Sequence, residues 1–354
     1  MVQAIFFTII IKLFINLVLF SVASIQSVKN TFMHIKSLTI TLSFVVFLLS
    51  CQKDKSSNSE YTVGKNRFTI TVDGTEREYY VHVPAGYTNN SATPVVIMCH
   101  GGGQTGEQFY NISGWKEVGD SVNILTVFPT ALIYCTNEDG VTANMTKWNS
   151  FPGGSAICPG VNQKDDVKFI KDMITAIKAR FNVDAKRIYM VGFSNGGQFT
   201  ATCSVEISDI LAAAIASGGG GAFPRDTTCN PVRLLPSMLM FGNKDEKMIK
   251  GLGLPAGSSV PMGFTELYAT YPYLYSAQPK PYINTFRLNT ATYTVSGDTN
   301  SVVTADYVGL SGNPNNVFKM VELKGMDHEY PNGLNYPLRG AVYHWAWFKQ
   351  YSLP

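Results

Sequence analysis

The sequence predicts an α/β protein in which a mostly parallel central sheet is covered by helices on both faces. Two observations support this fold class. Continuous apolar runs, such as residues 94–99 and 124–128, are typical of strands that are buried on both faces. Segments with a helical spacing of apolar residues alternate with these runs, and such alternation favours parallel strands joined by helical connections.

Residues 1–50 are predicted to form a leader that is not part of the fold. The basic segment 33–36 precedes an apolar stretch, 37–50, which ends at Cys51 before a polar run. This order is typical of a signal peptide. Residues 48–51, Leu-Leu-Ser-Cys, also resemble a bacterial lipobox, in which the cysteine is acylated. We therefore expect translation from Met33, lipidation at Cys51, membrane attachment through that lipid and a location outside the cytoplasm. An ordinary transmembrane anchor is the alternative.

The charge balance argues against binding to nucleic acid. The chain has 28 basic and 25 acidic residues, but Lys12, Lys29 and Lys36 lie in the leader, which has no acidic residue. From Cys51 onward, the chain carries 25 residues of each sign. A neutral chain lacks the basic surface that nucleic acid requires.

The cysteines that follow the leader are expected to pair, because an oxidising compartment favours disulfides. Cys135 and Cys158 flank a loop rich in Gly, Asn and Pro, and Cys203 and Cys229 bracket another segment. We predict these two disulfides, with Cys99 left unpaired inside an apolar strand. There is no Cys-x-x-Cys and no accompanying histidine cluster, so the sequence indicates no metal site, and no cofactor is expected.

The order of elements after the leader indicates one folded domain. Residues 51–64 are polar and are predicted to be a flexible tether, and residues 65–354 are predicted to form a single catalytic domain. The predicted strands cover residues 68–72, 79–83, 94–99, 124–128, 187–191, 238–241 and 317–321. The predicted helices cover residues 166–182, a segment from about Gly197, and a closing segment around 344–348.

A possible nucleophile lies between a predicted strand and a predicted helix. Residues 192–196, Gly-Phe-Ser-Asn-Gly, fit the G-x-S-x-G pattern of a serine on a sharp strand-to-helix turn. The glycines suit this turn because a Cβ at either position would clash as the backbone folds tightly. The pattern alone is weak in a Gly-rich chain, but here the required strand and helix flank it. Ser194 is therefore the predicted nucleophile.

The hydroxyl of such a serine needs a base. In this arrangement the chain order is serine, acid, histidine, which removes His82 and His100 from consideration. His344 lies among aromatic residues of the closing helix, where a packed histidine is the better interpretation. His328 lies in a loop directly after a predicted strand, where catalytic residues are common. We predict His328 as the base.

The orienting acid is expected between the serine and the histidine, after another buried strand. Residues 235–241 form that strand and lead to Asp245, the predicted acid, with Glu246 as the alternative. Asp245 would hold the imidazole in the correct tautomer and stabilise its charged form.

A glycine loop follows the strand that ends at Cys99. Residues 100–104, His-Gly-Gly-Gly-Gln, match the HGGG type of loop, whose backbone N–H groups stabilise an oxyanion. We expect the N–H groups of Gly102 and Asn195 to form the oxyanion hole, with Gly103 as an alternative donor. A phosphate-binding loop is the rival interpretation, but the Lys-Ser/Thr that such a loop requires is absent.

Five motifs appear in a characteristic order. They are residues 100–104, 165–170 (Asp-Asp-Val-Lys-Phe-Ile), 182–184 (Asn-Val-Asp), 192–197 and 325–328 (Gly-Met-Asp-His). Together they resemble the polyhydroxybutyrate depolymerase/feruloyl esterase family, from about residue 66 to 246 and again at 317–331. The resemblance implies the α/β-hydrolase fold, a serine esterase with the triad Ser194, Asp245 and His328, and a polysaccharide-linked ester or a polyester as substrate.

Three features bear on the substrate. Trp148 matches an aromatic position of this family and could stack on a feruloyl ring or a sugar, although simple packing explains it equally well. Gln104, at the end of the glycine loop, is a second predicted substrate contact. Residues 247–316 do not match the family and are rich in Tyr and Pro, so they form either a lid or substrate platform, or scaffold. Residues 325–331 depart from the Gly-x-Gly-His-x-Trp-Pro that is common in the family, which leaves the substrate class open.

Two other functions use the same residues. A serine peptidase or amidase would share the triad, but the chain has no propeller domain and no marked pocket for a cationic amine. A non-catalytic surface binding protein on a hydrolase scaffold would be expected to lack a triad residue, and all three are present. A carboxylic-ester hydrolase is therefore the predicted function.

Overall fold

The computed structural model describes residues 61–138, 140–150, 156–226 and 228–354. Met33, Cys51 and most of the expected tether lie outside these residues. The strands of the described part are β1 (Gly64–Val72), β2 (Thr75–Val83), β3 (Thr93–Cys99), β4 (Leu125–Pro129), β5 (Ile133–Glu138), β6 (Val141–Thr146), β7 (Val183–Phe193), β8 (Ala213–Ser217), β9 (Ser237–Gly242), β10 (Leu288–Asp298), β11 (Val302–Gly309) and β12 (Val317–Leu323).

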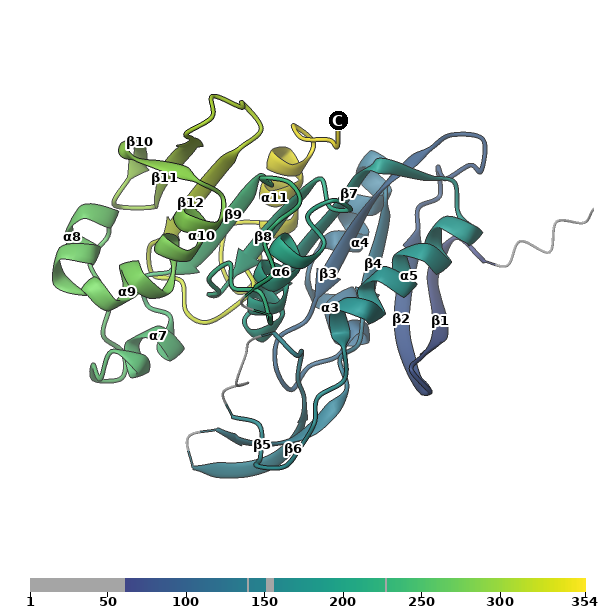
Figure 1. Ribbon diagram of the computed structural model, residues 1–354, viewed down its shortest axis with the longest axis horizontal. Helices are drawn as coiled ribbons and strands as arrows, with labels where there is room; N and C mark the ends of the chain where they lie inside the picture. Colours follow the sequence, from purple (N-terminus) through teal and green to yellow (C-terminus); the bar gives the residue numbers. More distant parts are fainter. Residues whose placement is uncertain (1–60, 139, 151–155, 227) are drawn as a thin grey trace, which may run out of the picture. The chain divides into compact units, whose positions relative to one another are not determined.

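All of these strands except β5 and β6 form one sheet (Figure 1). Its strand order is β1-β2-β4-β3-β7-β8-β9-β12-β11-β10. The central strands, from β4 to β12 in this order, pair in parallel. The strands at the two edges, β1 and β2 at one and β10 and β11 at the other, pair antiparallel. The sheet is therefore mostly parallel at its centre, as the continuous apolar runs predict.

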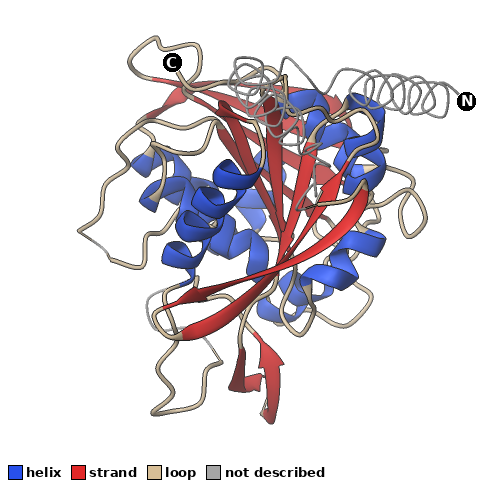
Figure 2. Ribbon diagram, turned by 90° about the vertical axis from the view of Figure 1, so that its right-hand side faces the viewer, coloured by secondary structure: helices blue, strands red, loops and turns tan. Residues whose placement is uncertain are grey.

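Helices cover both faces of this sheet (Figure 2). They are α3 (Gly106–Ile112), α4 (Trp115–Val122), α5 (Asp166–Arg180), α6 (Asn195–Glu206), α7 (Glu246–Gly251), α8 (Phe264–Thr270), α9 (Pro272–Ala277), α10 (Pro279–Thr285) and α11 (Gly340–Phe348). The fold class predicted from the sequence, with helices on both faces of a mostly parallel sheet, is confirmed.

Two hydrophobic cores lie on the two faces of the sheet. Alternate side chains of a strand point to opposite faces, so that in β3 Val95 and Ile97 join one core, and Val96 and Met98 the other. The first core packs against α5, α6, α8 and α10, and the second packs against α3, α4 and α11. This arrangement explains why the central strands show continuous apolar runs rather than an alternation.

Residues 247–316, which do not resemble the family, contribute helices and two strands. β11 and β10 extend the sheet beyond β12, and α8, α9 and α10 lie at the same end of the sheet (Figure 1). Tyr282 of α10 is buried and stacks on Phe318 of β12, with the ring centroids 4.4 Å apart. Much of this segment is therefore packed against the sheet.

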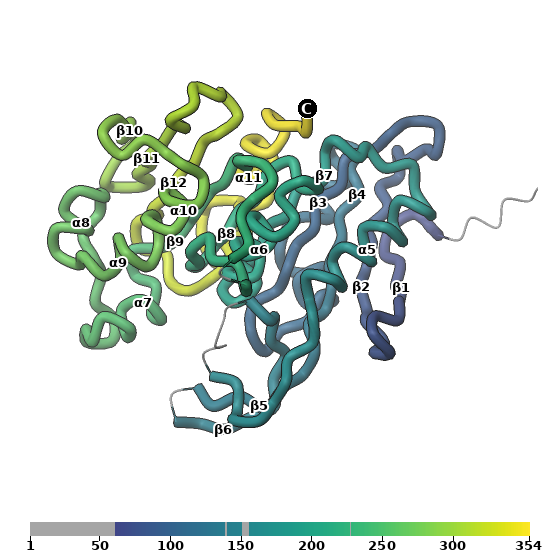
Figure 3. Tube along the Cα trace, viewed as in Figure 1, coloured from purple at the N-terminus to yellow at the C-terminus, as the bar shows by residue number. Residues whose placement is uncertain are grey.

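A short hairpin, β5–β6, stands apart from the main sheet and projects from its lower end in Figure 3. The predicted disulfide between Cys135 and Cys158 is present and closes the segment that contains this hairpin. The second predicted disulfide is wrong, because Cys203 and Cys229 are both free. Cys203 is fully buried in the core-facing side of α6, whereas Cys229 lies in a partly exposed loop. Cys99 is free and buried, as predicted.

The described residues from Tyr61 to Pro354 belong to one compact unit. None of the helices described in this unit is long and apolar enough to span a bilayer.

Candidate active site

Three of four adjacent parallel strands bring the predicted catalytic residues to one edge of the sheet. Ser194 directly follows β7, Asp245 follows β9, and His328 lies in the loop after β12. Because β7, β8, β9 and β12 are adjacent and parallel, their carboxyl ends lie at the same edge.

The backbone at Ser194 adopts a conformation that is rare for residues other than glycine. Its φ is +54° and its ψ is −121°, between the end of β7 and the first turn of α6. The flanking glycines are required by close approach: a Cβ on Gly192 would lie 2.0 Å from the carbonyl oxygen of Gly196. A Cβ on Gly196 would lie 2.3 Å from the carbonyl oxygen of His100. The turn thus holds the serine side chain clear of the sheet.

Hydrogen bonds join the three predicted catalytic side chains in series. His328 Nε2 lies 2.8 Å from Ser194 Oγ, and His328 Nδ1 lies 2.7 Å from Asp245 Oδ2. The other carboxylate oxygen, Asp245 Oδ1, accepts hydrogen bonds from the backbone N–H groups of Lys247 (2.9 Å) and Met248 (3.1 Å). Asp245 is therefore held as the N-cap of α7 while it orients the imidazole.

His344, which was set aside as the base, and Glu246, the alternative acid, do not join this series of hydrogen bonds. His344 is fully buried, its Nδ1 is 3.0 Å from Tyr330 Oη, and burial lowers its pKa to about 3. Glu246 is exposed, and its backbone N–H donates to the carboxylate of Asp327 at 2.9 Å. Among the described residues, neither His344 nor Glu246 forms a hydrogen bond or an ion pair with Ser194 or His328.

His100 has a structural role in the glycine loop. Its Nδ1 donates to the carbonyl oxygen of Gly101 at 2.7 Å, and its Nε2 accepts from the N–H of Ala131 at 3.0 Å. Burial lowers the pKa of His100 to about 4, so the ring is neutral at physiological pH.

Two backbone N–H groups beside Ser194 have no protein acceptor in the described part of the chain. One belongs to Asn195, the first residue of α6, whose N–H cannot bond within the helix. The other belongs to Gly102. The N–H of Gly101 donates to Gln104 Oε1 at 3.2 Å. The N–H of Gly103 donates to the carbonyl oxygen of Thr146 at 2.9 Å, which excludes Gly103 as the alternative oxyanion donor.

Trp148 is not a substrate platform, contrary to the prediction. Its side chain is 2% exposed and stacks on Phe199, with the ring centroids 4.8 Å apart and an interplanar angle of 4°. Its Nε1–H donates to the carbonyl oxygen of His100, and its backbone N–H donates to Asn195 Oδ1 at 2.7 Å. A buried ring cannot stack on a sugar or a feruloyl group, so Trp148 instead positions the segment that bears Asn195.

A cleft of about 650 Å³ lies over Ser194, Asn195 and His328. Gln104 lines this cleft, although its Oε1 is already used by the N–H of Gly101. Lys147 also lines it and forms an ion pair with Glu138, and its side chain is 13% exposed. The sequence carries no signal for Lys147, because its place beside Gly102 depends on the fold of the β5–β6 hairpin.

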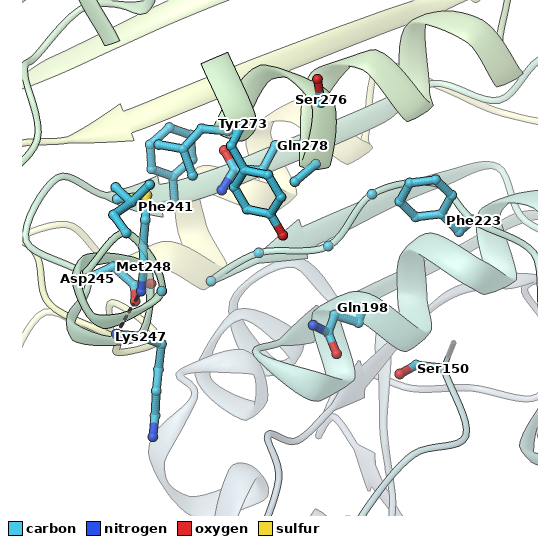
Figure 4. A pocket seen from close by; sticks show the side chains of 18 residues that line it. Ser150, Gln198, Phe223, Phe241, Asp245, Lys247, Met248, Tyr273, Ser276 and Gln278 are labelled. Atoms are coloured by element: carbon cyan, nitrogen blue, oxygen red, sulfur yellow. Dashed lines mark hydrogen bonds between the residues drawn. The ribbon is translucent and has the colours of Figure 1, made fainter. Parts of the chain in front are cut away.

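A second pocket, of about 570 Å³, adjoins this cleft, and the two share Gln198, Gly218 and Lys247 (Figure 4). The sequence does not predict this pocket. Its one local signal is the run of four glycines at 218–221, directly after β8. Across the described residues, no group of three or more His, Cys, Asp or Glu is arranged to hold a metal ion.

A serine follows β7, an acid follows β9 and a histidine follows β12. Together with the strand order, this placement defines the α/β-hydrolase fold. Within this fold class, residues 87–252 match the family described as Phospholipase/Carboxylesterase. The solved structure of an acetyl xylan esterase from Aspergillus awamori has the same fold, with a TM-score of 0.52 at 14% identity over 80% of this chain and 99% of that one.

Curated relatives share about a quarter of their residues with this chain over half of its length or less. A bifunctional acetylxylan esterase/xylanase from Neocallimastix patriciarum is 24% identical over 49% of this chain and 22% of its own length. Feruloyl esterase B from Piromyces equi is 27% identical over 50% of this chain and 31% of its own length. Poly(3-hydroxyalkanoate) depolymerase C from Paucimonas lemoignei is 28% identical over 40% of this chain and 31% of its own length. The family resemblance predicted from the motifs is confirmed. The matched segments span less than a third of these proteins.

Proposed function

We propose that this protein is a serine carboxylic-ester hydrolase that forms an acyl-enzyme on Ser194. The observation that carries this proposal is the series of hydrogen bonds from Ser194 through His328 to Asp245 beside two free N–H groups. The names of the curated relatives, which are esterases and a polyester depolymerase, support the same reaction class.

The geometry suits acyl transfer in two steps. His328 Nε2 accepts the proton of Ser194 Oγ as the oxygen attacks the ester carbonyl, and Asp245 stabilises the imidazolium through Nδ1–H. The N–H groups of Gly102 and Asn195 stabilise the negative charge that develops on the carbonyl oxygen. His328 then gives the proton to the leaving alkoxide, and water, activated in the same way, releases the acid from Ser194.

The substrates that we propose are acetyl or feruloyl esters on polysaccharide, or a polyester. The names of the relatives, an acetylxylan esterase/xylanase, a feruloyl esterase and a poly(3-hydroxyalkanoate) depolymerase, support this range. We further propose that the protein acts outside the cytoplasm, attached through a lipid on Cys51. Metabolic labelling with a palmitate analogue would then depend on Cys51, and unchanged labelling of Cys51→Ala would refute the anchor.

Replacement of the nucleophile tests the reaction class. Ser194→Ala should abolish the release of p-nitrophenol from p-nitrophenyl acetate and the labelling of the protein by a fluorophosphonate probe. Thr175→Ala, an exposed hydroxyl on α5, serves as the matched control and should leave both unchanged. Turnover retained by purified Ser194→Ala would refute the assignment.

A further inference from the structure

Asp166 belongs to one of the five sequence motifs, residues 165–170, but it has no part in the triad. It is the first residue of α5, and its side chain is fully buried. Its neighbour Asp165 caps this helix by accepting from the N–H of Lys168 at 2.9 Å, so capping does not explain Asp166. A buried carboxylate is costly unless charged and polar partners satisfy it, and the partners of Asp166 indicate its role.

One partner of Asp166 is a buried arginine of β2. Asp166 Oδ1 accepts from Arg77 Nη2 at 2.6 Å, and the Arg77 side chain is 1% exposed. The guanidinium also lies over the ring of Phe169, 3.9 Å from its centroid. Arg77 Nε and Nη1 have no hydrogen-bond partner among the described residues. The ion pair therefore holds one oxygen of the carboxylate and leaves the other, Oδ2, for a different donor.

The second oxygen of Asp166 holds the segment 148–150, which follows the β5–β6 hairpin. Asp166 Oδ2 accepts from the backbone N–H of Asn149 at 2.7 Å. The carbonyl oxygen of Ser150 accepts from the hydroxyl group of Thr202 on α6. Both bonds end on the backbone of segment 148–150, so they fix its path between α5 and α6.

This segment clamps the side chain of Asn195. The backbone N–H of Trp148 donates to Asn195 Oδ1 at 2.7 Å. Asn195 Nδ2 donates to the carbonyl oxygen of Trp148 at 3.3 Å and to Ser150 Oγ at 3.2 Å. Trp148, Ser150 and Asn195 are all buried, so water does not compete for these bonds. Because the side chain and backbone of a residue move together, the three bonds also fix the direction of the Asn195 N–H group.

The same stretch of chain holds the glycine loop on the other side of the oxyanion hole. Trp148 Nε1–H donates to the carbonyl oxygen of His100 at 2.9 Å. The carbonyl oxygen of Thr146 accepts from the N–H of Gly103 at 2.9 Å. Residues 146–150 thus position the two N–H groups of the oxyanion hole relative to each other. This position matters because a misplacement of about 1 Å in an active site lowers the rate by up to about a hundredfold.

We propose that Asp166 is a positioning residue for the oxyanion hole: it holds segment 148–150 through the N–H of Asn149, and this segment fixes the N–H of Asn195. The proposal rests on the esterase function proposed above and adds to it a residue outside the triad and the oxyanion hole. Arg77 then serves to keep the carboxylate in place. What the site requires at position 166 is a hydrogen-bond acceptor, not a charge.

Two double variants separate the acceptor from the charge. Arg77→Met/Asp166→Asn removes both charges but keeps an oxygen that accepts from Asn149. Arg77→Met/Asp166→Leu removes the charges and the acceptor, and neither double variant leaves a buried charge unpaired. With p-nitrophenyl acetate, the first should keep kcat within about twofold of the native value. The second should lower kcat about tenfold at unchanged KM, because the oxyanion forms only in the transition state.

A trifluoromethyl ketone reports on the oxyanion hole directly, because its adduct with Ser194 carries a negative oxygen there. The inhibition constant of 1,1,1-trifluoroacetone should rise about tenfold in Arg77→Met/Asp166→Leu and stay near the native value in Arg77→Met/Asp166→Asn. The pH dependence of kcat/KM, which reports the titration of His328, should be the same in all three proteins because the triad is untouched. Asp165→Asn, which preserves the helix cap, is the matched control and should change none of these values.

A double-mutant cycle tests whether Asp166 acts through Asn195. Asn195→Ala keeps the backbone N–H but loses the three bonds of its side chain, and should lower kcat about tenfold in the native background. In the background of Arg77→Met/Asp166→Leu, the same change should lower kcat by less than about threefold, because the clamp is already loose. Tenfold decreases in both backgrounds would overturn the proposal, as would equal kcat in the two double variants.

Two controls separate the possible failures. Urea denaturation shows whether each double variant is folded. If one is not, Ser150→Ala replaces it, because this change removes one bond to Asn195 and leaves the ion pair in place. Ser150→Ala should lower kcat about threefold at unchanged KM, and an unchanged kcat would overturn the proposal. If the native enzyme does not hydrolyse p-nitrophenyl acetate, the proposed function itself is refuted.

Discussion

At the scale of single residues, Lys147 stands beside the N–H group that we assign to the oxyanion hole. A Cβ on Gly102 would lie only 2.9 Å from Lys147 Nζ. The Lys147 side chain is largely buried, and its ion pair with Glu138 fixes its position. A positive charge held near a developing oxyanion stabilises it, and more strongly where solvent is excluded.

Lys147→Met should therefore lower kcat for p-nitrophenyl acetate about tenfold while KM changes little, because the charge acts mainly on the transition state. This decrease in kcat is smaller than the decrease expected from loss of a backbone N–H donor, because Glu138 already neutralises part of the Lys147 charge. Steady-state kinetics of Lys147→Met measures this effect. Lys244→Met, an exposed lysine that does not line the cleft, is the matched control. An increase in KM at unchanged kcat would show that Lys147 only binds substrate.

Residues differ in how far the sequence predicts their roles. Ser194, Asp245 and His328 each follow a strand that is recognisable as an apolar run, so their convergence at one sheet edge could be expected. Trp148 and Lys147 could not be assigned in this way. Whether a Trp faces substrate or core, and whether a Lys lies beside the oxyanion hole, depends on tertiary neighbours such as Phe199 and Glu138, which local sequence does not reveal.

At the scale of elements, the disulfide-closed hairpin β5–β6 supports the site from outside the main sheet. Cys135 and Cys158 are 23 residues apart, and the segment between them includes Lys147 and Trp148. Trp148 bonds to Asn195, whose own N–H is a predicted oxyanion donor. The disulfide thus restrains a segment on which the geometry of the oxyanion hole depends.

Removal of this disulfide in a Cys135→Ser/Cys158→Ser double variant should lower the free energy of unfolding by about 3 kcal/mol, as expected for a loop of this length. It should also lower kcat, because the contacts of Trp148 and Lys147 become less well fixed. Urea denaturation and ester hydrolysis measure the two effects. Cys229→Ser, at a free and partly exposed thiol, should change neither. An unchanged kcat in the double variant would show that the hairpin is held by its packing alone.

Strands and helices were predictable where a local pattern of apolar residues marks them. Every predicted strand lies in or overlaps an observed one, because the longer central strands show continuous apolar runs. The buried strand β8 was missed, since its short Ala-rich sequence is a weak strand signal. β10 was missed because it is an exposed edge strand, with no buried residue after Leu288. The pairing of Cys203 failed for a related reason: spacing alone does not show that its helical position faces the core.

At the scale of the whole molecule, the two cores enclose ionisable groups whose pKa values change on folding. Burial lowers the pKa of His100 to about 4 and that of His344 to about 3. Burial raises the pKa of Glu322, on β12, to about 7. One carboxylate oxygen of Glu322 accepts from the N–H of Gly263 at 2.8 Å, and the other is buried without a partner.

These shifts act on stability in opposite directions. A histidine whose pKa falls from 6.5 on folding stabilises the fold fully above pH 6.5, and this contribution is lost as the pH falls toward the folded pKa. A glutamate whose pKa rises from 4.5 to about 7 stabilises the fold below pH 4.5, and this contribution is lost as the pH rises through 7. Stability should therefore decline on both sides of a range near neutral pH.

Two variants separate these contributions in urea denaturation at pH 5 and pH 8. The free energy of unfolding of His344→Gln should fall about 2 kcal/mol less than that of the native protein between pH 8 and pH 5, because the unfolded chain no longer takes up that proton. Relative to the native protein, the free energy of unfolding of Glu322→Gln should be about 3 kcal/mol higher at pH 8 than at pH 5. The reason is that the native fold buries the Glu322 charge only at the higher pH. The loss of a contact, such as that between His344 and Tyr330, changes the free energy of unfolding equally at pH 5 and pH 8. It therefore cancels in the difference between the two pH values. Identical pH dependence in the native protein and both variants would show that these groups are solvated in the folded state.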